Sequence, residues 1–295
     1  EPSLRSQAIS ATLGHAQARP EFLDRADLQT LLDQIVDFET KFFSAQIIDK
    51  TARRLDAEGA LGGPVHLSGR STEPPVGFPP PPAFDEYNNW VGRTGNAKAA
   101  QQASIERGQA IFNGTGPRST FIMANVGGFN DATLGPGGPP LGNPSPFPNS
   151  CALCHGFPHA GSELVLPPQR DIGTGGQASP NSFDGPTAVA DPGVGPLPAG
   201  DLPVFKVTCT GGASHPFYGT EIITNDPGSA LITGKCADIG KKTVPALRGL
   251  ASRAPFFSDG SANDLRAVVN FYVKRFNMQL NEQDKVDLTN FLAAL

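Results

Sequence analysis

Apolar side chains recur every three or four residues in several stretches of the chain, and this is the period of an amphipathic α-helix. Two such stretches lie near the N-terminus, at residues 2–18 and 24–47, and both contain few helix breakers. The apolar stripe of the second stretch is formed by Leu28, Leu31, Leu32, Ile35, Phe38 and Phe42. Both stretches are therefore expected to be helices.

Two further helices are predicted at the C-terminal end, over residues 261–276 and 281–295. The first carries an apolar stripe of Leu265, Val268, Val269, Tyr272 and Phe276. In the second, Asn281 is a suitable N-cap and Asp284 stands at the third helical position. Its apolar face consists of Leu288, Phe291, Leu292 and Leu295. These two stretches indicate a helical core.

Shorter elements are expected between these two ends. Residues 104–114 predict a short helix capped by Ser104, residues 243–254 predict another capped by Thr243, and residues 204–209 predict a short strand. The chain also contains 34 glycines and 29 prolines, well above ordinary usage. Because these residues are clustered, the predicted fold is mainly α, a compact helical core with long Pro/Gly-rich loops.

Charge and hydropathy exclude two classes of partner. The net charge is −5 and no basic tract occurs, which argues against nucleic acid. No apolar run approaches the ~20 residues needed to cross a bilayer, so no membrane span is expected. The sequence has no signal peptide and starts at Glu1, as if an upstream part had been removed.

The sequence CALCH places Cys151, Cys154 and His155 in the pattern Cys-x-x-Cys-His. Two thiols at this spacing can both reach the vinyl groups of one haem, and the adjacent histidine can bind its iron, which is the signature of c-type attachment. A zinc site would need two further ligands at metal spacing, and a thioredoxin-like pair would need a βαβ context. We therefore expect one covalent haem c at these three residues.

Small and aromatic residues in the flanking helices favour a cytochrome c-like haem domain. Gly108 and Phe112 precede the motif, while Phe291 and Leu292 belong to the last helix. A cytochrome c fold crosses its first and last helices at such positions and wraps them around haem.

The two remaining cysteines, Cys209 and Cys236, form an even remainder after haem attachment. Attachment of this type implies an oxidising compartment, so the two are expected to form a disulfide. Two separate buried thiols are the alternative. We accordingly expect a periplasmic or otherwise exported protein.

The stretch KKTVPALRGLASRAPFFSDGSANDLRAVVNFYVKRF, followed by LNEQDKVDLTNFLAAL, resembles the C-terminal haem domain of the bacterial dihaem cytochrome c peroxidase/MauG superfamily. SIERGQAIFNG resembles the helix that opens that domain, and SLRSQA and LLDQIVDFETKFFSAQ resemble the end of the family's N-terminal haem domain. The resemblance implies a helical segment and linker over residues 1–95 and a cytochrome c-type haem domain over residues 96–295. Because the family's first haem motif lies upstream, the resemblance also implies a second haem-bearing segment or chain. The chain is then a processed C-terminal piece or the partner of a separate polypeptide, and a one-haem relative of the family is the alternative.

The resemblance further suggests the sixth ligand of the haem iron. Counted from Leu265, the family position of this ligand is Tyr272, as in MauG-like members, whereas peroxidase members use Met. Met278 is the alternative, about 9 Å further along if the helix continues. His159 and His215 come third.

Other roles follow from the resemblance alone. His15 and Gln17 match groups over the open face of the family's other haem, where an acid or base would assist O–O cleavage. Arg253 and Pro255 match a segment that binds calcium through backbone carbonyls. Arg248 and Arg253 are candidates for pairing with haem propionates.

Three functions remain open at this point. The chain is part of a haem peroxidase or oxidase, an electron-transfer cytochrome without catalysis of its own, or a haem subunit of a larger assembly. Each requires a redox partner protein. Ser258 stands where the family often has a histidine, and this departure removes an imidazole near the haem.

Overall fold

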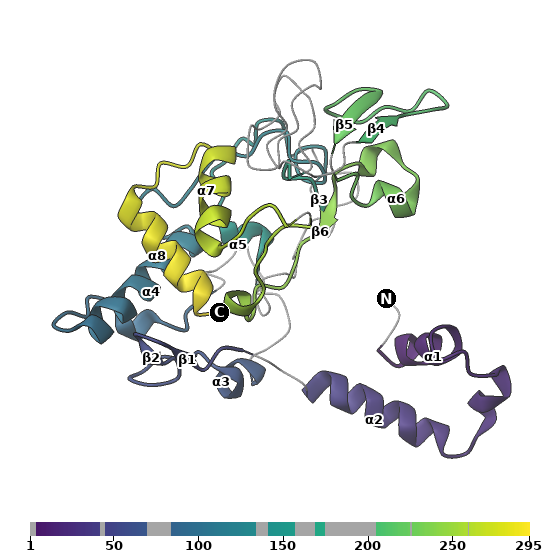
Figure 1. Ribbon diagram of the computed structural model, residues 1–295, viewed down its shortest axis with the longest axis horizontal. Helices are drawn as coiled ribbons and strands as arrows, with labels where there is room; N and C mark the ends of the chain where they lie inside the picture. The colour runs from purple at the N-terminus through teal and green to yellow at the C-terminus, as the bar shows by residue number, and fades with distance from the viewer. Residues whose placement is uncertain are drawn as a thin grey trace. The chain divides into compact units, whose positions relative to one another are not determined.

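The computed structural model (Figure 1) describes residues 4–41, 45–69, 84–133, 141–156, 169–174, 205–224, 226–258 and 260–295. The chain divides into two compact units, Glu1–Ser44 and Ala45–Leu295. The resemblance implies a different division, after residue 95, and that division stays a prediction. Leu55, Phe84 and Trp90 are buried in the core of the larger unit.

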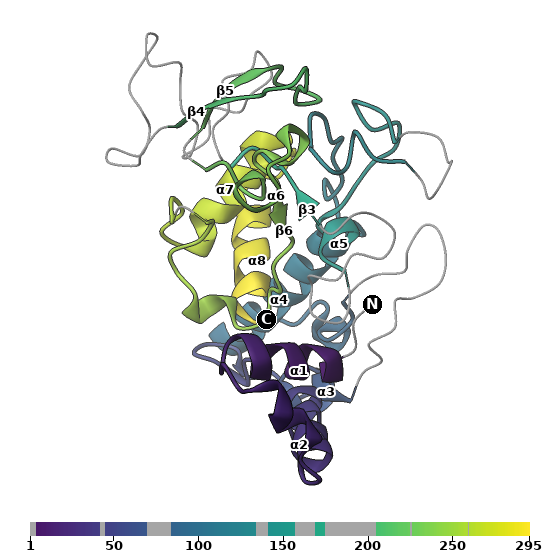
Figure 2. The ribbon, with the colours of Figure 1, turned by 90° about the vertical axis from the view of Figure 1, so that its right-hand side faces the viewer.

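The smaller unit is a helical hairpin (Figure 2). It contains α1 (Leu4–Gly14), the 3-10 turn η1 (Pro20–Asp24) and α2 (Leu28–Lys41), so both helices are shorter than the stretches that predict them. Its core consists of Ala8, Leu28 and Leu32, with Ile9, Phe22 and Leu23 packed against them. Phe42, the last residue of the expected stripe, lies outside the described residues.

The larger unit is mainly helical in its described parts. Its α-helices are α3 (Pro64–Ser68), α4 (Ala97–Asn113), α5 (Cys151–Cys154), α6 (Ala230–Thr233), α7 (Leu265–Arg275) and α8 (Glu282–Ala293). Its 3-10 turns are η2 (Asn88–Trp90), η3 (Cys236–Asp238) and η4 (Leu250–Ser252). None of the helices in the described ranges combines the length and hydropathy that crossing a membrane requires.

The strands of the described residues form three small antiparallel pairs. They are β1 (Ile48–Asp49) with β2 (Arg53–Arg54), β3 (Gln169–Arg170) with β6 (Lys242–Thr243), and β4 (Phe205–Thr208) with β5 (Glu221–Thr224). The strand predicted over residues 204–209 is confirmed as β4. The expected loops over 114–149 and 156–203 lie partly outside the described residues.

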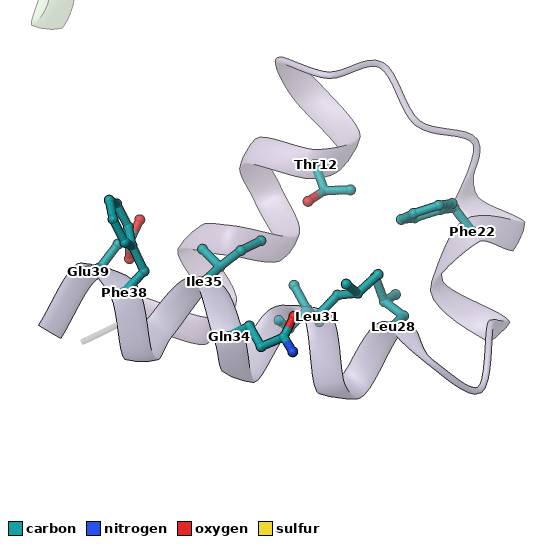
Figure 3. Close-up of a pocket in the computed structure, with 9 residues that line it drawn as sticks. Thr12, Phe22, Leu28, Leu31, Gln34, Ile35, Phe38 and Glu39 are labelled. Atoms are coloured by element: carbon teal, nitrogen blue, oxygen red, sulfur yellow. The ribbon is translucent and has the colours of Figure 1, made fainter. Parts of the chain in front are cut away.

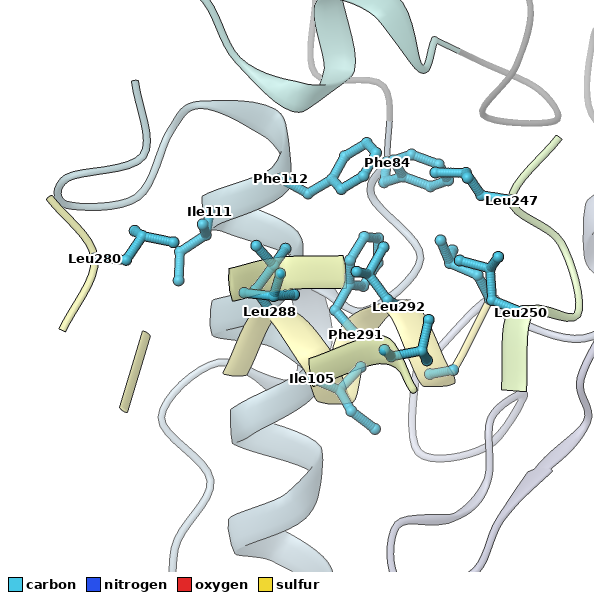
Figure 4. Packing of buried hydrophobic residues seen from close by; sticks show 14 of the residues in the cluster. Phe84, Ile105, Ile111, Phe112, Leu247, Leu250, Leu280, Leu288, Phe291 and Leu292 are labelled. Atoms are coloured by element: carbon cyan, nitrogen blue, oxygen red, sulfur yellow. The ribbon is translucent and has the colours of Figure 1, made fainter. Parts of the chain in front are cut away.

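The core of the larger unit is built where α4 crosses α8 (Figure 4). Gly108 marks the closest approach, because a Cβ there would collide with the Asp287 carbonyl and lie 2.6 Å from Phe291 Cβ. Phe291 packs against the rings of Phe84 and Phe112 at centroid distances of 5.3 and 5.5 Å. Small and aromatic residues thus allow these two helices to pack closely, as the sequence predicts.

One ion pair and one hydrogen bond at the edge of this crossing join the same two helices. Arg107 on α4 contacts Asp287 on α8 at 2.6 Å, and Ser104 donates to the same carboxylate at 2.6 Å. Ser104 was expected to cap a short helix, but the helix begins a full two turns earlier. Asn96 is the N-cap and its side chain accepts from the Ala99 N–H at 2.9 Å.

The helix predicted over residues 243–254 is wrong. Thr243 belongs to β6, where it pairs with Gln169, and only the single turn η4 follows. The pairing with the distant Gln169 holds Thr243 in an extended conformation, and Gly249 adopts a left-handed conformation with φ 70°, which a right-handed helix does not contain.

The caps of α7 and α8 are formed by side chains. Asp264 accepts from the Ala267 N–H at 2.7 Å, so α7 begins later than residue 261. At α8, Asn281 and Asp284 form the capping box, with distances of 2.8 and 2.9 Å. This confirms the start that the sequence predicts for the last helix.

Candidate functional site

The Cys-x-x-Cys-His sequence forms a single helical turn, α5. Cys151 and Cys154 stand three residues apart and therefore lie on one face of the turn. The His155 N–H donates to the Cys151 carbonyl at 2.9 Å, while the dihedral angles of His155 (φ −106°, ψ 64°) lie outside the helical range. The chain thus presents two thiols and an imidazole from five consecutive residues.

Two contacts fix α5 to the larger unit. Immediately before it, Asn149 and Phe121 exchange backbone hydrogen bonds of 3.0 and 2.8 Å. At the end of α4, Gly114 has φ 81°, and a Cβ there would lie 2.7 Å from Ser150 Cβ. Because only glycine accepts this conformation and this close approach without strain, the end of α4 determines where the turn begins.

The surroundings of α5 are apolar. Cys151 packs against the main core of the unit, and the His155 ring lies 6.2 Å from the Phe112 ring, measured between centroids. Burial raises the pKa of the Cys151 thiol to about 12, and the neighbouring Cys154 contributes in the same direction. Neither of these cysteines is in a disulfide. The Cys151 sulfur is therefore a neutral thiol at physiological pH.

The raised pKa of Cys151 argues against a redox-active reading of the motif. A redox-active Cys-x-x-Cys pair needs a cysteine of lowered pKa, and the pKa of Cys151 is shifted the other way. A structural zinc ion needs four converging ligands. Among the described residues, no group of three or more His, Cys, Asp or Glu side chains converges in that way.

Tyr272 lies on α7, where it packs against the same core as Cys151. Burial raises the pKa of its phenol, and the two thiols of Cys151 and Cys154 raise it further. The phenol oxygen is thus within electrostatic range of both cysteines. The structure brings together the motif and the residue that the resemblance suggests as sixth ligand.

Met278 lies beyond the end of α7. The helix stops at Arg275, and Asn277 adopts a left-handed conformation with φ 48°. The estimate of 9 Å between Tyr272 and Met278 rests on a continuous helix and therefore does not apply. The Met278 side chain is buried in the main core.

His215 is not suited to bind iron. Its Nδ1 accepts from the Phe217 and Tyr218 N–H groups at 3.2 and 3.3 Å. The other ring nitrogen then carries the proton of the neutral ring, and burial lowers the pKa of this histidine. His159 lies outside the described residues.

Arg248 has a buried carboxylate partner. Its guanidinium lies 3.2 Å from Glu86, and it also stacks over the Phe84 ring at 5.3 Å. Glu86 is a neighbour that the sequence did not suggest. The propionate role of Arg248 stays a prediction.

The other residues implied by the resemblance are on the surface or bonded locally. Arg253 donates to the Ala246 carbonyl at 2.7 Å. Pro255 follows a cis peptide bond. His15 and Gln17 are exposed just beyond α1. Their roles in calcium binding, propionate binding and catalysis stay predictions.

Ser258, the residue that departs from the family pattern, donates to the Asp226 carboxylate. Lys242 lies 3.2 Å from the same carboxylate.

Cys209 and Cys236 form a disulfide, with their Cα atoms 5.8 Å apart. The bond joins the residue after β4 to the first residue of η3. It agrees with the pairing expected from the even cysteine count.

Tyr218, Asp171 and His215 form a second polar cluster that no sequence pattern predicts. Tyr218 donates to Asp171 at 2.9 Å and stacks on His215 with centroids 4.4 Å apart. Asp171 and Tyr218 are 47 positions apart and belong to no periodic pattern. A tyrosine three residues after a histidine in an irregular segment was the only local signal.

A groove also lies in the smaller unit, between its helices (Figure 3). It is lined mainly by apolar side chains, namely Thr12, Phe22, Leu28, Leu31, Leu32, Gln34, Ile35, Phe38 and Glu39. The lining contains no histidine or cysteine.

No family model, curated protein or solved structure significantly matches this chain.

Proposed function

We propose that this chain is a c-type haem protein that takes part in redox catalysis or electron relay. Cys151 and Cys154 would hold the haem covalently, and His155 would bind its iron. The observation that carries the proposal is the one-turn helix α5, which presents two thiols on one face and a histidine directly after them.

The surroundings fit a large apolar group. The thiols are not joined to each other, and the pKa of Cys151 is raised as expected in an apolar environment. Phe112 lies beside His155, and Tyr272 approaches both cysteines from α7. Thiols, imidazole and apolar walls are the donor set that covalent haem requires.

The packing of the larger unit supports a cytochrome c-like domain. Its first long helix, α4, crosses the last helix, α8, at Gly108, and the turn with the cysteines follows the end of α4. This arrangement is the one expected for a domain that wraps haem between its terminal helices.

We further propose that the chain belongs to the dihaem cytochrome c peroxidase/MauG-like group. The haem would supply one-electron chemistry, and Tyr272 would bind its iron together with His155. A phenolate is a hard anionic donor that favours ferric over ferrous iron and lowers the potential. Burial raises the pKa of Tyr272, so the phenol is protonated before it binds a metal, and binding as a phenolate would release that proton. A calcium ion near Arg253 and Pro255 belongs to the same proposal.

An electron-transfer cytochrome is the second candidate. The observation that favours it is the buried position of Met278 in the same core. A thioether ligand raises the haem potential, which suits an electron carrier. The potential of the protein therefore distinguishes the two candidates.

The proposal includes a redox partner protein and a second haem-bearing segment or chain. It also places the protein in the periplasm or another exported location. The disulfide between Cys209 and Cys236 supports such an oxidising compartment.

The haem is tested by intact mass and by the pyridine haemochrome spectrum of natively purified protein. We expect the mass of the polypeptide plus one haem and a c-type spectrum. The double variant Cys151→Ala/Cys154→Ala should lose both the added mass of the haem and the c-type spectrum. The matched control, Cys209→Ala/Cys236→Ala, loses the disulfide and should keep the haem. A denatured mass equal to the bare polypeptide would refute the proposal.

The sixth ligand is tested by absorption and resonance Raman spectra of Tyr272→Phe and Met278→Ala. If Tyr272 is the ligand, the first variant changes the ferric spectrum and the second does not. The reverse result assigns Met278 and favours the electron carrier.

A further inference from the structure

The chain has three tyrosines, and they differ in the acceptor that each hydroxyl faces. Tyr87 donates to the Ala294 backbone carbonyl at 3.0 Å. Tyr272 lies within range of two thiols. Tyr218 donates to the Asp171 carboxylate at 2.9 Å. A carboxylate is a base that can take a proton, whereas an amide carbonyl is only an acceptor. Tyr218 is thus the tyrosine with a base at the end of its hydrogen bond.

The carboxylate of Asp171 is held in place from several sides. Its residue has no exposed surface, and its other oxygen accepts from the Gly173 N–H at 2.8 Å. Its backbone exchanges hydrogen bonds of 3.2 and 2.9 Å with Gly127. Because both carboxylate oxygens accept hydrogen bonds and the residue is buried, the carboxylate cannot rotate away from the phenol. The hydrogen bond from Tyr218 therefore has a defined geometry.

The guanidinium of Arg275 lies near Tyr218 and Asp171 but does not replace the phenol as the hydrogen-bond donor to Asp171. Arg275 interacts electrostatically with both Tyr218 and Asp171, while its guanidinium donates to the carbonyls of Ile172 (2.9 Å) and Ala124 (3.0 Å). Those carbonyl bonds fix the guanidinium at the end of α7. The cation balances the Asp171 charge and leaves the Tyr218 hydroxyl as donor to it.

The Tyr218 ring is also fixed. It stacks on His215 at 4.4 Å with an interplanar angle of 11°. The imidazole is itself held by the N–H groups that its Nδ1 accepts from Phe217 and Tyr218. Lys241, which lies 3.5 Å from Asp131 and 3.6 Å from Asp238, is also within electrostatic range of His215.

These contacts have a chemical consequence for oxidation. Burial raises the pKa of the Tyr218 phenol, and the charge and hydrogen bond of Asp171 raise it further. The phenol therefore stays protonated, and a simple outer-sphere loss of an electron would leave a strongly acidic radical cation in a buried site. A base in line with the O–H bond removes that difficulty, because the proton can leave together with the electron.

We propose that Tyr218 is a redox-active tyrosine whose proton moves to Asp171 when its electron is withdrawn. One electron leaves the phenol to a one-electron oxidant of high potential, the class that includes oxidised metal centres and photo-oxidised metal complexes. The O–H bond of Tyr218 breaks and an O–H bond forms on Oδ2 of Asp171. The products are a neutral tyrosyl radical, a neutral carboxylic acid and the oxidant reduced by one electron. Return of the electron reverses both transfers.

This inference goes beyond the proposed function and does not depend on it. The oxidant of the test is external, and haem content is measured separately. If the haem test fails, the Tyr218 proposal still stands. If the radical test fails, the haem proposal still stands.

The test uses full-length protein and a photo-oxidised ruthenium polypyridyl complex, with the radical detected by transient absorption and electron paramagnetic resonance. We expect a tyrosyl radical in the wild type, with slower formation in D2O. Tyr218→Phe should remove most of the signal. Asp171→Asn keeps the shape of the side chain but removes the base, and should slow radical formation by about 100-fold, the scale of a well-placed base.

Tyr87→Phe is the matched control, because it removes a buried hydroxyl that faces only a carbonyl, and the radical should persist in it. Far-UV circular dichroism checks that each variant is folded. If Asp171→Asn is unfolded, the slower radical formation of the wild type in D2O and the loss of the radical signal in Tyr218→Phe still decide whether Tyr218 loses a proton together with its electron. A radical that persists in Tyr218→Phe, resides on Trp90, or forms equally fast in folded Asp171→Asn would overturn the proposal.

Discussion

Helices α2 and α8 are both amphipathic and of similar length, 14 and 12 residues, but their apolar stripes meet different surroundings. The stripe of α8 is buried, because α4, α7 and η4 all pack against it. On α2, Leu28 and Leu32 are buried, whereas Ile35 and Phe38 remain 40% and 66% exposed. Among the described residues, α2 packs against α1, which contributes Ala8 and Ile9, and against η1, which contributes Phe22 and Leu23. A stripe therefore predicts which face is apolar, while the partner helix determines how much of that face is covered.

The largest expected effect compares two phenylalanines. Phe291 on α8 has no exposed surface, so Phe291→Ala should lower the free energy of unfolding of the larger unit by about 3–5 kcal/mol. The readout is urea unfolding followed by Trp90, the single tryptophan, which lies in that unit. Phe38→Ala on α2 should change this free energy by about 0.5 kcal/mol or less. If both substitutions lowered the free energy of unfolding equally, the proposed difference in burial between α8 and α2 would be wrong.

The close approach of α4 and α8 gives the next effect. In Gly108→Ala, the new Cβ meets the Asp287 carbonyl and Phe291 Cβ, and such overpacking costs about 3 kcal/mol. Gly69→Ala is the control, since its nearest neighbouring atom lies at 3.7 Å and its φ is −84°. Urea midpoints of the two variants are compared with the wild type. A stable Gly108→Ala would mean that the helices are further apart than the structure has them.

The capping box of α8 predicts a smaller effect. Asn281→Ala removes the acceptor of the Asp284 N–H and should cost about 1 kcal/mol of unfolding free energy. The thermal midpoint measures it. An unchanged midpoint would show that the α8 start is held by packing alone.

The smallest expected effect is a pH dependence. A hydrogen bond from Arg118 holds the pKa of Asp284 below its usual value, against the opposing effect of burial. A carboxyl whose folded pKa is depressed stabilises the protein above its unfolded pKa of 3.8, and this stabilisation is lost as the pH falls through the folded pKa. In urea titrations below pH 4, Asp284→Asn should therefore lose less stability on acidification than the wild type. A parallel loss in both proteins would contradict the assignment.

Local signals explain what could be predicted from the sequence. The capping box of α8, the Cys-x-x-Cys-His turn and the small residue at Gly108 each act within a few residues or one helix face. The long start of α4 was missed, because residues 97–103 lack an apolar stripe although Asn96 caps them. The error at residues 243–254 has the opposite cause: Thr243 could cap a helix, but its backbone pairs with the distant Gln169.

The candidate site also has one part that the sequence shows and another that only the folded chain shows. Cys151, Cys154 and His155 lie within five consecutive residues and are visible in the sequence, whereas the proximity of Tyr272 depends on how α7 packs. The partners Glu86 of Arg248 and Asp171 of Tyr218 come from segments 162 and 47 positions away. Pairings over such distances have no periodicity, so only the folded chain reveals them.

The disulfide between Cys209 and Cys236 closes the chain into a ring that contains β5 and α6. A ring can be opened by cleavage of one peptide bond without releasing either piece. A protease that cuts once inside it would yield a protein that migrates as a single chain without reductant and as two fragments with reductant. The disulfide therefore keeps the two pieces covalently joined after a single cut in this segment, which no other disulfide does for the rest of the described chain.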